Sequence, residues 1–430
     1  MLSSNEQIDL MITGSSRSYA SQTANGSLVG MNDLIDEYCP AVKEAIPEDL
    51  LEYTKVNGIS YGVPTVRDWG YNLSYMVRKD IYDKYDLGSY EVNTYNDLTP
   101  IFKVITEGEG IPATVSYSAS ATVVESMTNA MFDTMLNGYG VLEYGHGTEV
   151  VNMYATDAFK AAVELVHEWY EAGYIPADLS TQSSTPQNLI ASGYTAGMLY
   201  TWKPGHDTKE SYQIGVDVVS IIVSPFITTT STVDSIMWSI PTTTVDATKA
   251  AQMLNLMYGN KELMDLWVYG IEGEHYVYLD EENDIITYPE GVDSNSTTYS
   301  PQTGWLYGNQ FLGHIFYPDT ATLWEETASW NANRQVTSLC AGFIPDLTDV
   351  ATELAAVTNV KSQYMSALGN GEVDPDEYLP ILIEELEAAG IDKIIATKQE
   401  QLDAWIAENG TAEQNPDYAD YSSASVIKID

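Results

Sequence analysis

The sequence has few basic residues and very few cysteines. Only 18 lysines and arginines stand against 62 acidic residues, so the formal net charge is -44 at pH 7. A chain this acidic repels polyphosphates and anionic membrane surfaces, which excludes nucleic-acid binding as its function. The two cysteines, Cys39 and Cys340, allow at most one disulfide and exclude a cysteine-built zinc cluster. Whether they pair stays open, and so does the redox compartment.

Long apolar runs are also missing. A membrane-spanning helix needs about 20 predominantly apolar residues, and even residues 214–227 are interrupted by Asp217 and Pro225. The start of the chain shows no basic stretch, apolar signal core or lipid-accepting cysteine. We therefore expect no transmembrane helix. The start fits a cytoplasmic protein, and equally a secreted protein that has lost its front end.

The common signals of catalytic chemistry are absent too. The five histidines are scattered and never stand at the i, i+4 spacing that presents two metal ligands from one helix face. No phosphate-binding glycine loop, dinucleotide fingerprint or nucleophile elbow occurs. Carboxylate pairs such as Glu281 and Glu282 cannot be told from the acidic background. We predict no metal, no cofactor and no enzyme activity.

What is present is a chain long enough for two or three domains, with strands and helices in alternation. Its 430 residues are 44% hydrophobic, which suffices for real cores. Alternation of this kind predicts an α/β fold with helices on the faces of sheets, and from residue 351 onward the pattern is nearly all helix. Expected strands cover residues 8–13, 59–66, 73–77, 112–115, 197–202, 214–223 and 235–240; expected helices cover 32–38, 79–85, 96–105, 156–170, 247–258, 263–269, 351–365, 375–388 and 394–408.

Aromatic residues are placed where a ligand could use them. Tyrosines number 31 against 7 phenylalanines, and a flat ring with a polar tip suits contact with polar ligands. Four tryptophans stand at or near expected strand ends, where α/β proteins bind ligands. Core packing of the same rings is an equally good interpretation. These tryptophans are Trp69, Trp202, Trp238 and Trp305.

Several segments carry a family resemblance. Residues 57–64 (NGISYGVP) and 73–80 (LSYMVRKD) resemble a motif that crosses between lobes, and residues 191–198 (ASGYTAGM) resemble a strand entry, with Thr195 in place of the usual lysine. The segment 269–276 (YGIEGEHY), continuing through 288–291 to 308–311, and the ending over residues 353–357, 388–392 and 401–405 are similar to subfamily signatures. The chain thereby resembles the extracellular solute-binding proteins of ABC importers, of the sugar-type lipoprotein group with a helical carboxy-terminal extension of unassigned function.

The resemblance implies an α/β, two-lobed, periplasmic-binding-protein-like fold of type II with a helical C-terminal extension. Residues 1–70 and 236–335 would form lobe 1, and residues 71–235 and 336–410 would form lobe 2 with the C-terminal helices. Residues 411–430 hold few apolar anchors, so we expect a flexible tail. Family members begin with a signal peptide, a lipid-anchored cysteine, a strand and a helix that are not seen here.

The resemblance also implies function. The protein would capture a carbohydrate, most simply an oligosaccharide, in the cleft between the lobes by hinge closure. It would act as a monomer, be lipid-anchored at the cell surface in its full-length form, and deliver solute to the membrane permease subunits of the importer. Expected ligand-binding residues combine aromatic faces with polar partners: Thr13, Ser16, Arg17, Arg67, Asp68, Trp69, Tyr71, Trp202, Trp238, Trp305 and Arg334.

Alternatives remain at this point. The same fold could bind a peptide or another polar metabolite, and a carbohydrate-active enzyme would need two carboxylates about 5 to 10 Å apart. A truncated, nonfunctional product is a third reading. Arg67 and Asp68 could instead form an ion pair that braces the hinge. If Trp69 and Trp202 stack on the ligand, alanine at either position should weaken binding by about 1 to 3 kcal/mol without unfolding.

Overall fold

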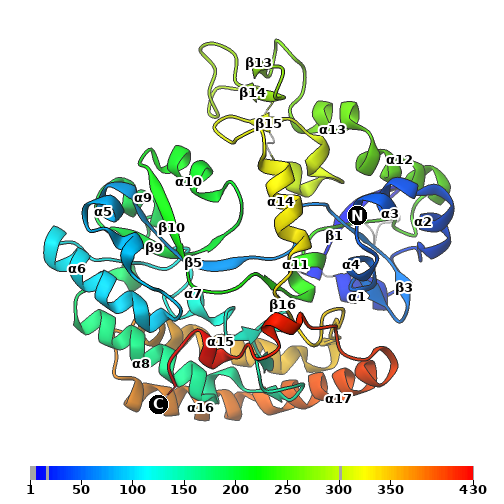
Figure 1. Ribbon diagram of the computed structural model, residues 1–430. Coiled ribbons are helices and arrows are strands. Elements are labelled where there is room, and N and C mark those ends of the chain that lie inside the picture. The colour runs from blue at the N-terminus through cyan, green and yellow to red at the C-terminus, as the bar shows by residue number, and fades with distance from the viewer. Residues whose placement is uncertain (1–5, 16–18, 300–302, 430) are drawn as a thin grey trace. The chain divides into compact units, whose positions relative to one another are not determined.

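The computed structural model describes residues 6–15, 19–299 and 303–429. The chain divides into two compact units, each built from separate stretches of sequence (Figure 1). Unit 1 comprises Met1–Gly70, Thr228–Asn333 and Ala341–Asp346, and unit 2 comprises Tyr71–Ile227, Arg334–Cys340 and Leu347–Asp430. The sequence predicted that the chain returns to lobe 1 after residue 235 and to lobe 2 after residue 335. It assigned residues 341–346 to lobe 2, whereas they belong to unit 1.

Unit 1 alternates short strands with helices. Its core gathers apolar side chains from α2, α3, α12 and α13, with Val63, Trp69 and Trp238 among the buried members. Its elements are β1 (Met11–Thr13), α1 (Tyr19–Ala24), α2 (Asn32–Tyr38), α3 (Pro40–Ala45), α4 (Glu48–Glu52), β2 (Lys55–Val56), β3 (Ile59–Ser60), β4 (Val63–Pro64), α11 (Thr230–Asp234), β12 (Met237–Ser239), α12 (Ala247–Gly259), α13 (Lys261–Val268), β13 (Val277–Asp280), β14 (Ile285–Thr287), β15 (Ile315–Phe316) and α14 (Leu323–Ala332).

The sheet of unit 1 that matters for the site has the order β1-β12-β4, and both of its pairings are antiparallel. Trp238 stands at its centre, opposite Ile12 on one side and Val63 on the other. Gly62 lies just before β4, and a Cβ there would come within 3.1 Å of Met237 Cβ. A glycine at this position therefore lets β4 lie close against β12.

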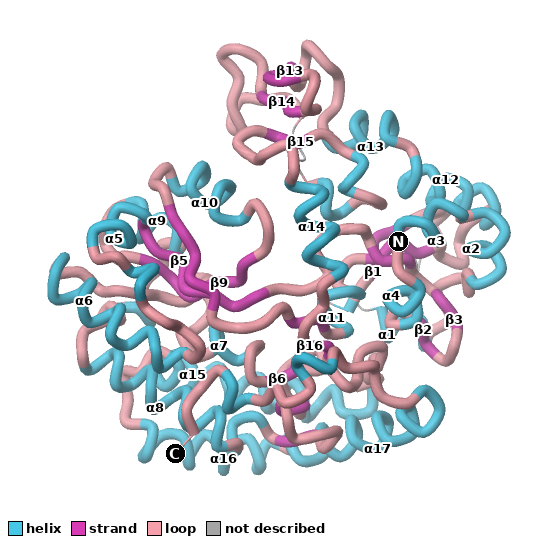
Figure 2. The backbone as a smooth tube through the Cα atoms, viewed as in Figure 1, coloured by secondary structure: helices cyan, strands magenta, loops and turns pink. Residues whose placement is uncertain are grey.

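Unit 2 carries the larger core, and the chain enters unit 1 from it at β11 (Ile227–Thr228). Figure 2 colours its helices and strands by type. Its elements are β5 (Asn72–Arg78), α5 (Lys79–Lys84), α6 (Thr99–Glu109), α7 (Glu125–Thr128), β6 (Phe132–Asp133), β7 (Val141–Glu143), β8 (Val150–Val151), α8 (Asp157–Glu171), α9 (Pro186–Ala191), β9 (Gly197–Trp202), α10 (His206–Ile214), β10 (Val218–Ile222), β16 (Val336–Thr337), α15 (Ala351–Gly369), α16 (Pro375–Ala389) and α17 (Ile391–Asn409).

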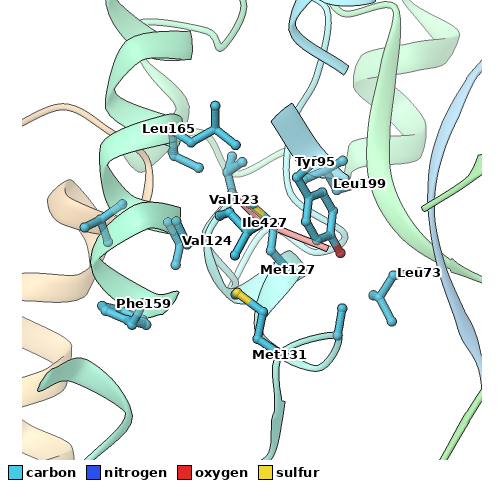
Figure 3. Packing of buried hydrophobic residues seen from close by; sticks show 14 of the residues in the cluster. Leu73, Tyr95, Val123, Val124, Met127, Met131, Phe159, Leu165, Leu199 and Ile427 are labelled. Atoms are coloured by element: carbon cyan, nitrogen blue, oxygen red, sulfur yellow. The ribbon is translucent and has the colours of Figure 1, made fainter. Parts of the chain in front are cut away.

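The central sheet of unit 2 has the order β10-β5-β9, again antiparallel throughout. Six of the seven residues of β5 are buried, because the strand lies between two others and is covered by helices. Helix α8 begins where the Thr156 hydroxyl accepts a hydrogen bond from the Phe159 amide, and it buries one apolar face. Figure 3 shows Phe159 and Leu165 of α8 in this core with Leu73 of β5.

The C-terminal helices α15, α16 and α17 pack on one another and on α8. Gly390 ends α16 in the left-handed conformation at φ 98°. The expected flexible tail is wrong for the described part of residues 411–430. Val426 and Ile427 are buried in the core of unit 2 (Figure 3), and Tyr421 donates its hydroxyl to the Ala130 carbonyl at 2.5 Å. Tyr418, Tyr421 and Ile429 also pack against this core, so apolar contacts and hydrogen bonds together fix the segment.

The expected strand over residues 112–115 is not assigned as one. Its carbonyls still accept hydrogen bonds beside β9, from the Ala196 amide to Pro112 and from the Leu199 amide to Val115. Within the described residues, no helix has the length and apolar character to cross a membrane. Cys39 of unit 1 and Cys340 of unit 2 are buried thiols that do not form a disulfide with each other.

Candidate functional site

Arg67 and Asp68 form an ion pair just after β4 in unit 1, and further hydrogen bonds fix the Arg67 side chain. The Arg67 Nη1 to Asp68 Oδ2 distance is 3.2 Å, and both side chains are 15% exposed. Arg67 Nη2 donates to the Ser235 hydroxyl at 2.5 Å and to the Thr232 carbonyl at 3.3 Å. The pair is therefore preorganised, and its small exposed surface limits what a ligand can reach.

The backbone around that pair is fixed by one amide. Asn331 of α14 donates its side-chain nitrogen to the Arg67 carbonyl at 2.7 Å and accepts from the Trp69 amide at 3.0 Å. The Trp69 ring is only 4% exposed, and its Nε1 donates to the Thr65 carbonyl. A ring this covered, with its donor already used, favours a packing role for Trp69 in the core of unit 1.

Trp238 of β12 belongs to a group of contacting aromatic rings, and Trp305 stands two residues before another member, Tyr307. Trp238 Nε1 donates to the Leu306 carbonyl at 2.8 Å, and the Thr65 hydroxyl donates to the Trp305 carbonyl at 3.0 Å. The group also holds two rings that the sequence prediction did not select. The Trp267 and Tyr307 rings stack with centroids 5.2 Å apart, and Trp238 lies 6.3 Å from Tyr307. We call Trp238, Trp267 and Tyr307 the aromatic group.

The sequence missed Trp267 because it sits on α13, where helical spacing predicts core packing. Trp267, Trp305 and Tyr307 are only partly buried, so each ring keeps some accessible surface. A cluster of rings with partly exposed apolar faces can stack on the C–H face of a pyranose. No periodicity in the sequence brings α13 and residues 304–307 together, since their contact is tertiary.

The first loop offers less than expected. Thr13 is fully buried in β1, and its hydroxyl lies 2.6 Å from the Ser239 hydroxyl of β12. It thus joins two strands and has no surface for a solute. Ser16 and Arg17 lie outside the described residues.

In unit 2, Tyr71 and Trp202 are brought close by β-pairing. Asn72, the residue after Tyr71, stands opposite Trp202 at the end of β9. The Trp202 side chain donates to the Asp207 carboxylate, where burial raises the pKa and the hydrogen bonds from Ser220 and Trp202 oppose that rise. Burial also raises the pKa of Tyr71, whose ring packs on the core of unit 2. Both side chains are partly buried.

Arg334 lies in unit 2, partly buried, at the point where the chain returns from α14. Its carbonyl accepts a hydrogen bond from the Asn415 side chain at 3.0 Å. The expected site residues thus fall into two sets, one around β4 and β12 in unit 1 and one that includes the β5 and β9 ends in unit 2.

Comparison with known proteins identifies the architecture. A family model described as a domain of unknown function (DUF3502) matches residues 339–407. A carbohydrate ABC transporter substrate-binding protein from Streptococcus pneumoniae is 25% identical over 417 residues, 94% of this chain and 80% of that protein. The crystal structure of an N-glycan transport solute-binding protein (NgtS) from Streptococcus pneumoniae matches with a TM-score of 0.81 at 24% identity, covering 95% of this chain and 88% of that one.

The chain has the solute-binding protein fold. The family resemblance predicted from the sequence is therefore confirmed, and so is the fold class with its helical C-terminal region. An extracellular solute-binding protein from Bifidobacterium longum subsp. infantis gives a further match, with a TM-score of 0.62 at 18% identity over 94% of this chain and 88% of that chain.

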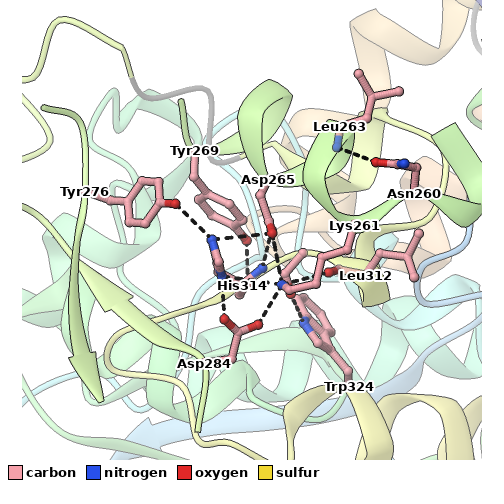
Figure 4. Close-up of polar contacts among 11 residues, drawn as sticks. Asn260, Lys261, Leu263, Asp265, Tyr269, Tyr276, Asp284, Leu312, His314 and Trp324 are labelled. Atoms are coloured by element: carbon pink, nitrogen blue, oxygen red, sulfur yellow. Dashed lines mark hydrogen bonds and ion pairs between the residues drawn. The ribbon is translucent and has the colours of Figure 1, made fainter. Parts of the chain in front are cut away.

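A buried polar cluster in unit 1 supplies no second solute site (Figure 4). His314 is 2% exposed and lies 2.6 Å from Asp284 and 3.5 Å from Asp265. Lys261 pairs with both carboxylates, at 2.7 and 3.0 Å. Burial raises the pKa of Asp265, whereas at Asp284 the hydrogen bonds from Lys261 and His314 outweigh the effect of burial and lower it.

Both carboxylates of that cluster are engaged by Lys261 and His314, so neither resembles the free acid and base of a glycosidase. The cluster instead fastens β14 and the start of β15 to α13, because its members come from those elements and their flanking turns. Among residues 6–15, 19–299 and 303–429, no group of three or more histidines, cysteines, aspartates or glutamates has the arrangement of a metal site.

Proposed function

We propose that this protein is the extracellular component of an ABC importer that captures a carbohydrate, most simply an oligosaccharide. The observation that carries the proposal is the similarity over 94% of the chain to a substrate-binding protein named for carbohydrate ABC transport. The structural likeness to NgtS supports it, since structures of that protein in complex with Man1GlcNAc and Man5GlcNAc also match this chain, with TM-scores of 0.72 and 0.70.

The chemistry of the two candidate sets supports a sugar as ligand. The aromatic group of unit 1 supplies ring faces, and the neighbouring Arg67 and Asp68 supply charged hydrogen-bond partners for hydroxyls. Trp202 of unit 2 supplies a further ring beside Asp207. The position of the ligand in a cleft that closes by hinge motion stays a prediction from the family resemblance.

Binding is tested directly by a thermal-shift screen of the purified protein. A ligand that binds only the folded state raises the melting temperature by mass action. The probes are Man1GlcNAc, Man5GlcNAc, a panel of plant and host oligosaccharides, and short peptides as the competing class. A sugar that shifts the melting temperature, with a dissociation constant then measured by calorimetry, would support the proposal. If only peptides raise the melting temperature, the protein binds peptides and not carbohydrates.

The proposal includes binding without bond cleavage. Its test is to incubate the protein with each bound sugar and to measure released reducing ends over time. A binding protein returns its ligand unchanged, whereas accumulating products would establish a carbohydrate-active enzyme.

The remaining parts of the proposal concern partners and location. We infer that the protein works as a monomer outside the cell, that its full-length form is lipid-anchored, and that it hands its solute to permease subunits in the membrane. Light scattering tests the monomer, and membrane fractionation of the native source with and without lipase treatment tests the anchor. Co-purification with the permease tests the partner.

A further inference from the structure

Unit 2 contains a cavity of about 340 Å³ that none of the expected site residues lines. Its walls come from three stretches of unit 2: residues 115–125, residues 179–189, and helix α15 of the C-terminal region. Small-molecule sites typically enclose about 300 to 1,000 Å³, so the cavity has the volume for a small ligand. Helix α15 lies within the segment that matches the domain of unknown function.

The lining is rich in hydroxyl groups from all three walls. Hydroxyls both donate and accept hydrogen bonds, which matches the groups that a saccharide presents. Apolar side chains interrupt them, with Tyr139, Leu179 and Met365 among the lining residues. Hydroxyl-bearing residues of the lining include Ser118, Ser120, Ser184, Thr358, Ser362 and Ser366.

One ion pair lies in the cavity wall, and its two opposite charges leave the wall without net charge. Lys361 Nζ of α15 lies 2.6 Å from Glu125 Oε1, and Glu125 Oε2 accepts hydrogen bonds from the Thr122 amide and hydroxyl. An ammonium has three N–H donors and a carboxylate has several lone pairs, so both ions keep hydrogen-bonding capacity beyond their own contact. A wall with one positive and one negative charge favours a neutral ligand over an ionic one.

The α15 wall is fixed to the other two walls. The Val124 amide donates to the Gly369 carbonyl at 3.0 Å, and the Val123 amide donates to the Asn370 side chain at 3.1 Å. A Cβ on Gly369 would lie 2.4 Å from the Thr122 hydroxyl oxygen, so the helix end approaches this closely only because residue 369 is glycine. Glu372 accepts from the Ser180 amide of the remaining wall. The cavity is therefore preorganised.

We propose that this cavity holds a neutral saccharide ring of the transported sugar, and that α15 of the domain of unknown function forms one wall of that subsite. The inference rests on the proposed function. It gives the C-terminal helices a role in ligand recognition in addition to packing.

The test introduces bulk at the cavity wall and compares it with bulk elsewhere on the same helix. Ser366→Leu and Ser362→Leu each place a larger apolar side chain in the lining, and Gln363→Leu places the same side chain at an exposed position outside it. Sugar affinity is measured by calorimetry, with the sugar that gives the largest thermal shift in the screen. Melting temperatures and circular dichroism establish that each variant is folded.

We expect the two serine variants to bind the sugar about tenfold or more weakly, and Gln363→Leu to bind as the unsubstituted protein does. If the unsubstituted protein binds a sugar and both serine variants bind it equally well, the inference is overturned while the proposed function stands. If no carbohydrate binds the unsubstituted protein, the proposed function fails first and the inference fails with it.

A labelling experiment covers the case in which leucine disturbs folding. Ser366→Cys introduces an accessible thiol, because Ser366 is exposed. The native Cys39 and Cys340 are 0% and 2% exposed, so labelling reports on the new thiol. We expect saturating sugar to slow maleimide labelling of this thiol several-fold, and to leave labelling of the control Gln363→Cys unchanged. Equal labelling rates with and without a bound sugar would overturn the inference.

Discussion

At the scale of single residues, the tryptophans at strand ends differ in how much of each ring is covered. Trp69 is enclosed by its own unit, and its Nε1 is engaged with the Thr65 carbonyl. Trp305 and Trp202 are only partly buried. All of these tryptophans stand near expected strand ends, so the sequence alone suggested the same role for each. How far each ring is buried depends on side chains that are distant in the sequence. Burial therefore separates a packing role from a binding role.

Replacing Trp69 by alanine should mainly cost stability. Loss of a buried tryptophan removes apolar contacts and leaves a cavity, which typically costs about 3 to 5 kcal/mol. We expect Trp69→Ala to lower the free energy of unfolding by that amount in urea denaturation. The sequence alone predicted that Trp69→Ala would weaken ligand binding without unfolding the protein. The burial of the ring predicts a loss of stability instead.

Trp305→Ala is the matched comparison, since its side chain is only partly buried and stands two residues from Tyr307 of the aromatic group. It should weaken sugar binding by about 1 to 3 kcal/mol with a smaller loss of stability. A Trp69→Ala protein as stable as its parent, or a Trp305→Ala protein with unchanged affinity, would contradict these assignments.

Lys398 is a buried cation in the core of unit 2, and no feature of the sequence sets it apart from the other lysines on exposed helix faces. Its ammonium donates to the Met135 carbonyl, the Asn137 side chain and the Gly140 carbonyl at 2.8 to 2.9 Å. These bonds tie α17 to the turn between β6 and β7. Burial lowers the pKa of Lys398 to about 7, although Asp133 opposes the shift.

This pKa predicts a dependence of stability on pH. An unfolded lysine titrates near 10.4, so between pH 7 and pH 10 the unfolded chain binds the proton more readily than the folded chain. Stability should rise with pH across that window, by up to about 1.4 kcal/mol per unit from this group. Urea denaturation of the parent and of Lys398→Met at pH 7, 8 and 9 measures the difference in slope.

The slope is the informative quantity, because Lys398→Met also removes three hydrogen bonds and lowers stability at every pH. The free-energy difference between the two proteins should widen as the pH rises. A difference that stays constant from pH 7 to pH 9 would contradict the lowered pKa.

At the scale of elements, local patterns predicted most helices of the chain and several strands. Residues 32–38 and 197–202 are α2 and β9 with the expected bounds, and α8 follows an amphipathic stripe that begins at a threonine cap. Predictions failed where the outcome depends on distant partners. Residues 112–115 lie beside β9 without being assigned as a strand, and the C-terminal segment is ordered by a core that the other elements of unit 2 create.

That ordered segment can be tested with one side chain. Ile427 is fully buried among residues of unit 2, so Ile427→Ala should lower the free energy of unfolding by about 2 to 5 kcal/mol. Lys428→Ala is the adjacent control, because its side chain is 61% exposed and its ion pair with Asp97 is of the surface kind, worth about 0 to 1 kcal/mol. Urea denaturation of both variants measures the loss in the free energy of unfolding. Equal losses in the two variants would contradict an ordered segment and support a flexible tail.

The candidate site was only partly accessible to sequence reasoning. The stretch from Arg67 to Tyr71 was selected for its mixture of charge and aromatic character, and the structure does hold Arg67 against Asp68. Trp267, Tyr307 and the cavity beside α15 escaped selection, because each depends on contacts between elements far apart in the chain. Serines and threonines that line a cavity have no spacing that distinguishes them from those of ordinary loops.

At the scale of the whole molecule, the excess of acidic residues is the dominant physical property. A formal net charge of -44 on 430 residues opposes compaction through repulsion between carboxylates. Ion pairs between exposed side chains, such as Lys43 with Asp36 and Lys79 with Asp83, offset this repulsion only weakly. The folded state is held mainly by the two apolar cores, one in each unit.

Salt should therefore stabilise this protein. The Debye length falls from about 30 Å at 0.01 M to about 10 Å at 0.1 M and about 3 Å at 1 M, so added salt screens repulsion between carboxylates before it reaches the closer ion pairs. We expect the melting temperature to rise steeply between 10 and 100 mM sodium chloride in dilute buffer at pH 7, and to level off above that, as measured by calorimetry. The same titration near pH 4, close to the sequence pI of 4.1, removes most of the net charge and should flatten the response. A melting temperature that falls with salt at pH 7 would show that the surface ion pairs outweigh the repulsion.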